Sequence, residues 1–355
     1  MAALDPSRIP WTPLALSVAV MAACTPDFPE VSWIGPHLQV AKTAEGPVCG
    51  GTNPYQDRYV ERLADLLGVA IVEPILFAYI DDSEIEDYCF DELWGCYYDG
   101  KAYSIMPTHT HELAHAVADR AGWDGPRALT EGFAEAYGFN SEGGLVRLPI
   151  RGVVEDFDRS ADSYYTAGLF VRFLVDRHGL GPFGELMRAT DSDSDFDEVA
   201  AAFEAHLGEP IEAAFEAFEA TYPTCSAWSN QAAIVECGLD PSPWVGESLE
   251  ITVALDCADE ATIGPNGSDP GEAWAPRSFE IPEGGLGIYK ATVTATGDAP
   301  SGVRITHCGG CEVDVDIIVG AGVSRTVALP AGRYYVDFVA AADAPMSLTL
   351  RLQSP

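Results

Sequence analysis

Basic side chains are scarce in this 355-residue sequence. It contains 19 Lys and Arg residues against 55 Asp and Glu, which gives a formal net charge of -36. So acidic a surface repels nucleic acid phosphates and anionic lipid headgroups, and we expect neither as a partner. The remaining composition, with 47% hydrophobic and 21% charged residues, is that of an ordinary globular protein. We therefore interpret the acidity as a solubilising exterior.

The sequence also offers little that could span a membrane. The apolar run from Leu14 to Ala23, preceded by one basic side chain, Arg8, is too short for a mature transmembrane helix but has the form of an export signal. Ala22 and Ala23 directly before Cys24 resemble the processing site of bacterial lipoproteins, at which the cysteine is lipidated. We expect residues 1–24 to be such a signal, with Cys24 as the only membrane anchor. The protein would then be exported to the cell envelope, with plain secretion as the alternative.

The cysteines agree with export. There are nine, and setting aside the lipidated one leaves an even number, which in an exported chain indicates disulfides. Closeness in sequence favours Cys89 with Cys96 and Cys225 with Cys237. For the Cys-Gly-Gly-Cys motif at 308–311 we favour a structural disulfide over a zinc ribbon or a redox motif, because no second such motif accompanies it.

The first part of the chain predicts a mixed domain. Residues 25–47 are rich in Pro and Gly and show no clear period, so we expect a leader or linker. Apolar residues at helical spacing predict a helix ending at Gly68. The β-branched run at 69–80 predicts a strand, and Asp99-Gly100 predicts the turn of a hairpin within 96–105. Further helical periods occupy 128–138, 163–179, 195–208 and 210–222.

Beyond about residue 240 the apolar residues recur with a period of two. The alternation runs through 249–255, 313–319, 334–338 and 346–352. Regularly spaced short strands between Gly- and Pro-containing turns predict a β-sandwich. We therefore expect an α+β protein. Its first domain, 48–235, would combine a small sheet with a helical subdomain, and an all-β sandwich would occupy 236–355.

One short stretch, Thr108 to Gly122, carries the first chemical motif, His111-Glu112-Leu-Ala-His115. Residues four apart lie on one face of a helix, so both imidazoles can bind one metal ion while Glu112 lies beside them. Taken alone, the motif could also be an ordinary helix face. His109 points off this face, and we expect a surface or capping histidine there.

Catalytic zinc needs a third protein ligand and a fourth position open to water. Glu131 is the best candidate, because the Gly- and Pro-containing break at 122–126 allows two helices to pack antiparallel. Glu135, one helical turn later, suits a carboxylate that accepts the free N–H of a ligand histidine. Two solvated glutamates are the alternative.

Three segments together, HELAH, TEGFAE and YYTAGLFVRFLVDRHG, resemble the gluzincin zinc metallopeptidases. The likeness is to the peptidase MA-like group related to thermolysin and the zinc aminopeptidases, and it covers roughly residues 48–222. It implies one catalytic Zn²⁺ bound by His111, His115 and Glu131, with Glu112 as general base and acid. Glu135 matches the acidic position four residues after the third ligand. Residues 328–352 resemble the β-sandwich modules appended to secreted bacterial peptidases.

Two details depart from the family. Fifteen residues separate His115 from Glu131, fewer than in thermolysin, so Glu135 is a rival third ligand by counting. We prefer Glu131 because it is the glutamate of the Glu-Gly-x-Ala motif. The Gly-x-Met-Glu-Asn motif by which the aminopeptidases bind a free amino terminus is absent, so exopeptidase activity is not indicated.

The family usually supplies a tyrosine that donates to the developing oxyanion. Tyr164 and Tyr165 lie in the matching segment and are both candidates, with helix packing as the alternative for either. We therefore expect an exported zinc peptidase that acts on peptides or proteins. The alternative from another class is a catalytically silent surface-binding or adhesion lipoprotein on the same scaffold.

Overall fold

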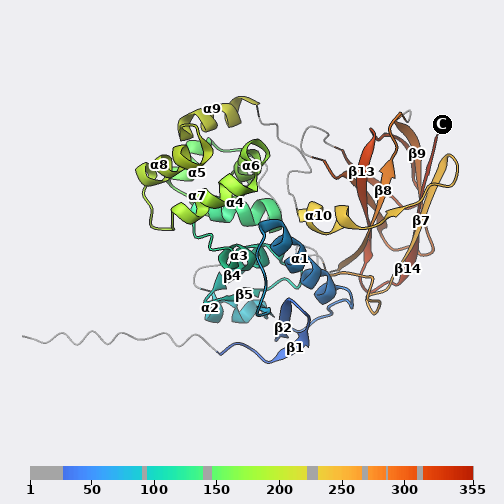
Figure 1. The fold of residues 1–355 in the computed structure, drawn as a ribbon. Helices are drawn as coiled ribbons and strands as arrows, with labels where there is room; N and C mark the ends of the chain where they lie inside the picture. The colour runs from blue at the N-terminus through green and yellow to red at the C-terminus, as the bar shows by residue number, and fades with distance from the viewer. Residues whose placement is uncertain are drawn as a thin grey trace, which may run out of the picture.

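The computed structural model describes residues 27–89, 94–138, 146–221, 231–265, 271–284, 287–309 and 315–354. Within these ranges the protein combines helices and strands, as the α+β prediction states, with the helices and one sheet in the first part and two further sheets in the second (Figure 1). Cys24 and the rest of the expected signal lie outside the described residues. None of the described helices is both long and apolar enough to cross a bilayer.

The first sheet has five strands in the order β1-β2-β3-β5-β4. Its inner pairs, β2–β3 and β3–β5, are parallel, and its outer pairs are antiparallel. The expected strand and hairpin are present, and Asp99 and Gly100 form the turn with positive φ. The strands are β1 (Val31–Ile34), β2 (Leu38–Lys42), β3 (Ile75–Tyr79), β4 (Gly95–Tyr98) and β5 (Lys101–Ser104).

The prediction of a leader at 25–47 is wrong for β1 and β2, which belong to this sheet. Both strands are only four or five residues long, too short to show a period in the sequence. Leu38 and Val40 are nevertheless buried in the main core. The carboxylate of Asp57 accepts hydrogen bonds from the backbone N–H groups of His37 and Leu38, at 2.8 and 2.9 Å, and so fixes the start of β2.

Side chains alternate between the two faces of the first sheet. Val40, Phe77 and Ala102 contribute to the main core under helices α1 and α3, whereas Ala78 and Tyr103 belong to a small cluster on the opposite face beside α2. The helices are α1 (Thr52–Leu67), α2 (Ile85–Tyr88), α3 (Thr110–Arg120), α4 (Arg127–Gly138), α5 (Ile150–Glu155), α6 (Ala161–His178), α7 (Leu180–Ala189), α8 (Phe196–Leu207), α9 (Ile211–Thr221) and α10 (Gln231–Ile234), with single 3₁₀ turns η1 (Asp82–Glu84) and η2 (Glu236–Gly238).

Six of the ten described helices match predicted ranges; the short helices α2, α5 and α10 have no counterpart in the prediction, and neither has the longer α7. Its sequence, LGPFGELMRA, contains residues that usually break helices. Pro182 lies in the first turn, where its missing N–H costs nothing. Gly184 lies so close to the ring of Trp123 that a Cβ at this position would be 2.6 Å from the indole. Close packing therefore outweighs weak local propensity in this helix.

The second part contains two sheets that share one hydrophobic core. Their strand orders are β11-β10-β13-β8-β6 and β12-β9-β14-β7. The alternation predicted at 249–255, 334–338 and 346–352 is present. Of the strand expected at 313–319, residues 316–319 lie in β11, whereas 313 and 314 lie outside the described residues. The strands are β6 (Pro241–Ser242), β7 (Ser248–Leu255), β8 (Glu272–Ile281), β9 (Ile288–Ala295), β10 (Ser301–His307), β11 (Asp316–Gly320), β12 (Ser324–Ala328), β13 (Gly332–Ala341) and β14 (Met346–Gln353).

Three disulfides join described cysteines: Cys89–Cys96, Cys49–Cys257 and Cys237–Cys308. The first confirms its prediction. The predicted pair Cys225–Cys237 is wrong because Cys237 bonds Cys308, while Cys225 and Cys311 lie outside the described residues. Closeness in sequence is a weak guide, since the entropy of loop closure changes slowly with loop length. The disulfides indicate an extracellular or periplasmic protein.

The loop between β7 and β8 forms hydrogen bonds with the first part of the chain, at the start of helix α1 and just before helix α3. Thr52 and Gly264 exchange hydrogen bonds of 2.7 and 3.0 Å, and the hydroxyl of Thr108 donates to the carbonyl of Pro265 at 3.2 Å. A Cβ at Gly51 would lie 2.6 Å from the carbonyl oxygen of Glu260, so the chain passes close to this loop. The sandwich therefore contacts the segment that leads into α3.

Candidate metal centre

Helix α3 places two histidines on one face. His111 and His115 are one turn apart, and the helix ends before Gly122, which has a φ of +71° that a glycine adopts without strain. The His111 side chain is 3% exposed and that of His115 is 12% exposed. Two imidazoles therefore project from a buried helix face.

Helix α4 runs antiparallel to α3 and brings Glu131 to the same place. The close approach depends on Gly138 in the last turn of α4, because a Cβ there would lie 2.6 Å from the Cα of His111 and from the carbonyl oxygen of Thr110. Both are backbone atoms and cannot rotate away. The hydroxyl of Thr110 donates to the carbonyl of Gly138 and joins the two helix ends. The sequence marked Gly138 only as the end of a helix.

Three potential ligand atoms converge between the helices. The Nε2 atoms of His111 and His115 are 3.2 Å apart, and Oε2 of Glu131 lies 3.2 and 3.1 Å from them. Tetrahedral zinc, with bonds of about 2.0–2.2 Å, separates its ligand atoms by about 3.3–3.5 Å. The three atoms are therefore spaced to fit one zinc ion with a fourth position left over, and among the described residues this is the only such group of three or more.

The charges around the three atoms favour a cation. Burial lowers the pKa of His111, but the neighbouring carboxylates of Glu131, Glu135 and Glu112 outweigh it and raise the pKa to about 10. Burial likewise raises the pKa of Glu131, yet the positive charge of His115 and the contacts with both histidines keep that pKa well below its usual range. A divalent cation bound here would be attracted by the same carboxylates and would replace the proton on Nε2 of a ligand histidine.

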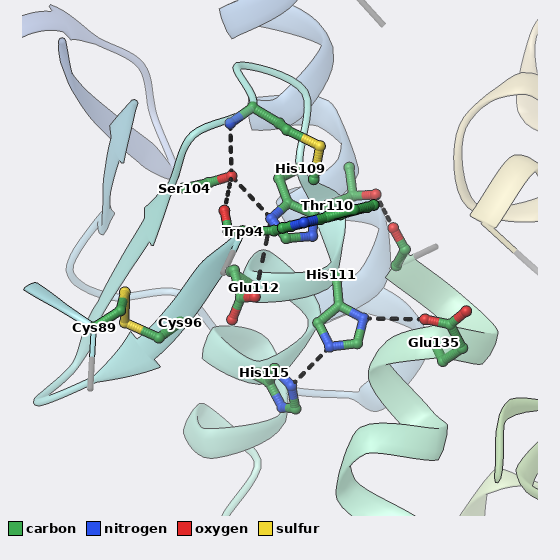
Figure 2. A network of polar contacts seen from close by, with 12 residues as sticks. Cys89, Trp94, Cys96, Ser104, His109, Thr110, His111, Glu112, His115 and Glu135 are labelled. Atoms are coloured by element: carbon green, nitrogen blue, oxygen red, sulfur yellow. Dashed lines mark hydrogen bonds and ion pairs between the residues drawn. A yellow bond between two sulfur atoms is a disulfide. The ribbon is translucent and has the colours of Figure 1, made fainter. Parts of the chain in front are cut away.

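Glu135 faces Nδ1 of His111, whereas the ligand group faces Nε2 of the same ring (Figure 2). Its Oε2 is 3.5 Å from Nδ1 of His111, and the side chain is fully buried. Neither carboxylate oxygen has a hydrogen-bond partner among the described residues. An imidazole that uses Nε2 for a metal directs its Nδ1–H toward this carboxylate, an arrangement that orients many metal-binding histidines. Glu131 rather than Glu135 therefore joins the group of three.

Glu112, Tyr164 and Tyr165 are the remaining candidates for a role at this group. Glu112 is 5% exposed and precedes His115 on α3. The ring of Tyr164 stands edge-on to that of His111, with centroids 5.9 Å apart, and against Phe157 at 5.1 Å. Tyr165 is buried in the hydrophobic core. Only Tyr164 of the two tyrosines therefore borders the ligand group.

The expectation of a surface or capping histidine at 109 is wrong. His109 is 2% exposed, and its side chain makes no capping hydrogen bond although the residue occupies the N-cap position of α3. It lies between β5 and α3, where its Nδ1 is 2.9 Å from the hydroxyl of Ser104. The helical period placed its side chain correctly off the ligand face but gave no sign of the sheet that covers it.

Comparison with known proteins gives no relative. No family model and no curated protein match the chain. Among solved structures, the periplasmic inhibitor of g-type lysozyme, PliG, of Salmonella Typhimurium is 11% identical with a TM-score of 0.21, covering 33% of this chain and 100% of its own. Hydroxypropylphosphonic acid epoxidase from S. wedmorenis is 16% identical with a TM-score of 0.14, covering 52% and 97%. Likenesses this low carry no argument about this protein.

The geometry predicts which glutamate matters most for metal binding. We expect the wild type to hold one Zn²⁺ per chain after dialysis, measured by elemental analysis, with affinity measured against a competing chelator. Glu131→Gln should weaken binding by more than about 100-fold because it removes a charged ligand, whereas Glu135→Gln should cost about 10- to 100-fold through the orientation of His111. Glu204→Gln, on the exposed face of α8, is the control. A larger loss from Glu135→Gln than from Glu131→Gln would make Glu135 the ligand.

Proposed function

We propose that this protein is an exported zinc-dependent peptidase of the gluzincin type, acting on peptides or proteins. The observation that carries the proposal is the convergence of Nε2 of His111, Nε2 of His115 and Oε2 of Glu131 within 3.2 Å of one another. Two histidines and one carboxylate with an open fourth position are the donor set of hydrolytic zinc sites.

Zinc bound by these residues would supply a Lewis acid that polarises a substrate carbonyl and acidifies a water molecule. Glu112, next to His111 on the same helix, would accept the proton of the attacking water and deliver it to the leaving amine. Glu112 is only 5% exposed, so its carboxylate lies away from bulk water. Glu135 would hold His111 through Nδ1, so that Nε2 stays free for the metal.

Tyr164 would donate a hydrogen bond to the oxyanion that develops on the substrate. The edge-on contact with His111 places its ring beside the ligand group, and Phe157 supports it from the side. Tyr165, one residue later on α6, points into the core. The likeness of the segment from Tyr164 to Gly179 to the gluzincins also supports this assignment.

Glu112→Gln separates catalysis from metal binding. We expect the variant to keep one zinc per chain and to lose cleavage of a casein or peptide-library substrate by about 10³-fold, because the amide cannot accept the proton. The exposed substitution Glu204→Gln is again the control. Cleavage unchanged by Glu112→Gln would refute the mechanism. Bound zinc with no cleavage by the wild type would favour a non-catalytic binding protein on the same scaffold.

Tyr164→Phe and Tyr165→Phe form a matched pair. Removing an oxyanion donor typically lowers kcat by about 10²-fold or more, so we expect this loss for Tyr164→Phe with a small change in KM. Tyr165→Phe should retain nearly full activity. Steady-state kinetics with a fluorogenic peptide would measure both, and equal activity of the two variants would remove Tyr164 from the mechanism.

We further propose that the chain is anchored through a lipid on Cys24. The support is the apolar run that ends in Ala22-Ala23-Cys24 and the extracytoplasmic setting indicated by the disulfides. Cells that express the wild type should incorporate labelled palmitate into the protein, and Cys24→Ser should abolish the label. An unlabelled wild type would leave secretion as the route.

A further inference from the structure

A buried pair of side chains, Ser104 and His109, lies behind Glu112 and is not used by the metal group. Ser104 is fully buried and His109 is 2% exposed. Figure 2 shows the two side chains in line with Glu112, between strand β5 and helix α3. Polar groups this deep in a protein need partners, and the partners here determine where the protons are.

The hydrogen bonds around Ser104 bear on the tautomer of His109. The hydroxyl oxygen of Ser104 accepts from the backbone N–H of Met106 at 2.9 Å. Its single proton is directed to the carbonyl oxygen of Trp94, 3.1 Å away, which can only accept. The third contact, 2.9 Å to Nδ1 of His109, is then satisfied only if Nδ1 is the donor. With the hydroxyl proton of Ser104 on the Trp94 carbonyl, the Nδ1–H tautomer of His109 completes these contacts.

The same N–H edge faces the carboxylate of Glu112. Nδ1 of His109 lies 3.9 Å from Oε1 of Glu112. Strand β4 confines both side chains, because a Cβ at Gly95 would lie 2.9 Å from Nδ1 of His109 and 3.1 Å from Cγ of Glu112. On its other side, the His109 ring stacks with that of His111, at a centroid distance of 5.8 Å. Glu112 thus lies against β4 at its Cγ and beside the His109 ring at its carboxylate.

We propose that His109, oriented by Ser104, is a positioning residue for Glu112. The backbone of Gly95 and the His109 ring restrict the rotamers of Glu112, and the positive end of the Nδ1–H dipole attracts Oε1. Together they hold the carboxylate at the ligand group, where it must meet the attacking water. This assignment rests on the proposed peptidase function, because it acts only through Glu112. It adds two residues, Ser104 and His109, to the six on α3, α4 and α6.

The kinetic test compares His109→Leu with His109→Asn. Leucine removes the N–H, whereas the side-chain amide of asparagine can place an N–H near the position of Nδ1. Misplacing a catalytic group by about 1 Å can cost about 10²-fold, so we expect His109→Leu to lose about 10- to 100-fold in kcat, with KM within about twofold and one zinc retained. His109→Asn should recover to within about threefold of the wild type. Ser104→Ala, which leaves the ring in place, should lose about 3- to 10-fold.

A zinc-loaded His109→Leu with the kcat of the wild type, or a His109→Asn as slow as His109→Leu, would overturn the proposal. If His109→Leu does not fold, Ser104→Ala provides the kinetic comparison, and wild-type kcat in that variant counts against it equally. A wild type without peptidase activity would instead refute the proposed function. In that case NMR of the zinc-loaded, histidine-labelled full chain still tests the pair: we expect the Nδ1–H tautomer for His109, and the Nε2–H tautomer would overturn the assignment.

Discussion

The close approach of helices α3 and α4 is the constraint on which the candidate site depends. At Gly138 the two backbones come so near that no side chain fits between them. Because Thr110 and His111 form the other side of this contact, the position of His111 relative to α4 is set by main-chain atoms. Glu131 and Glu135 then face the two nitrogens of one imidazole from successive turns. A contact between backbones thus determines which carboxylate meets Nε2 and which meets Nδ1.

Local sequence patterns were sufficient to predict which residues form a large part of the candidate site. His111 and His115 share a helix face because 3.6 residues make a turn, and Glu131 was identified from its motif and from the break before α4. The sequence offered Glu135 as a rival, and only the packing of the helices separates the two. The roles of Tyr164 and Tyr165 were open for the same reason, because adjacent residues on a helix face different surroundings that the period alone does not identify.

Features that depend on packing between separate elements were missed. Strands β1 and β2 are short and gain their burial from the sheet, so residues 25–47 looked like a linker. Cys237 lies closer in sequence to Cys225 than to Cys308, yet the fold brings it to Cys308. His109 looked exposed because its cover, strands β4 and β5, comes from the preceding hairpin. In each case the information lies in tertiary contacts, whereas helix periods and turns lie within a few residues.

The loop that joins β7 to β8 has a consequence for the order in which the molecule can be completed. Thr108 contacts Pro265 and Thr52 contacts Gly264, across separations of 157 and 212 residues. Ribosomes deliver the chain from its N-terminus, so the residues of helix α3 are synthesised well before the segment that contacts Thr108. The support beside the first histidine is therefore assembled only after the polypeptide has passed residue 265. A molecule truncated before that point would contain every candidate zinc ligand and still lack the brace on the segment that leads into their helix.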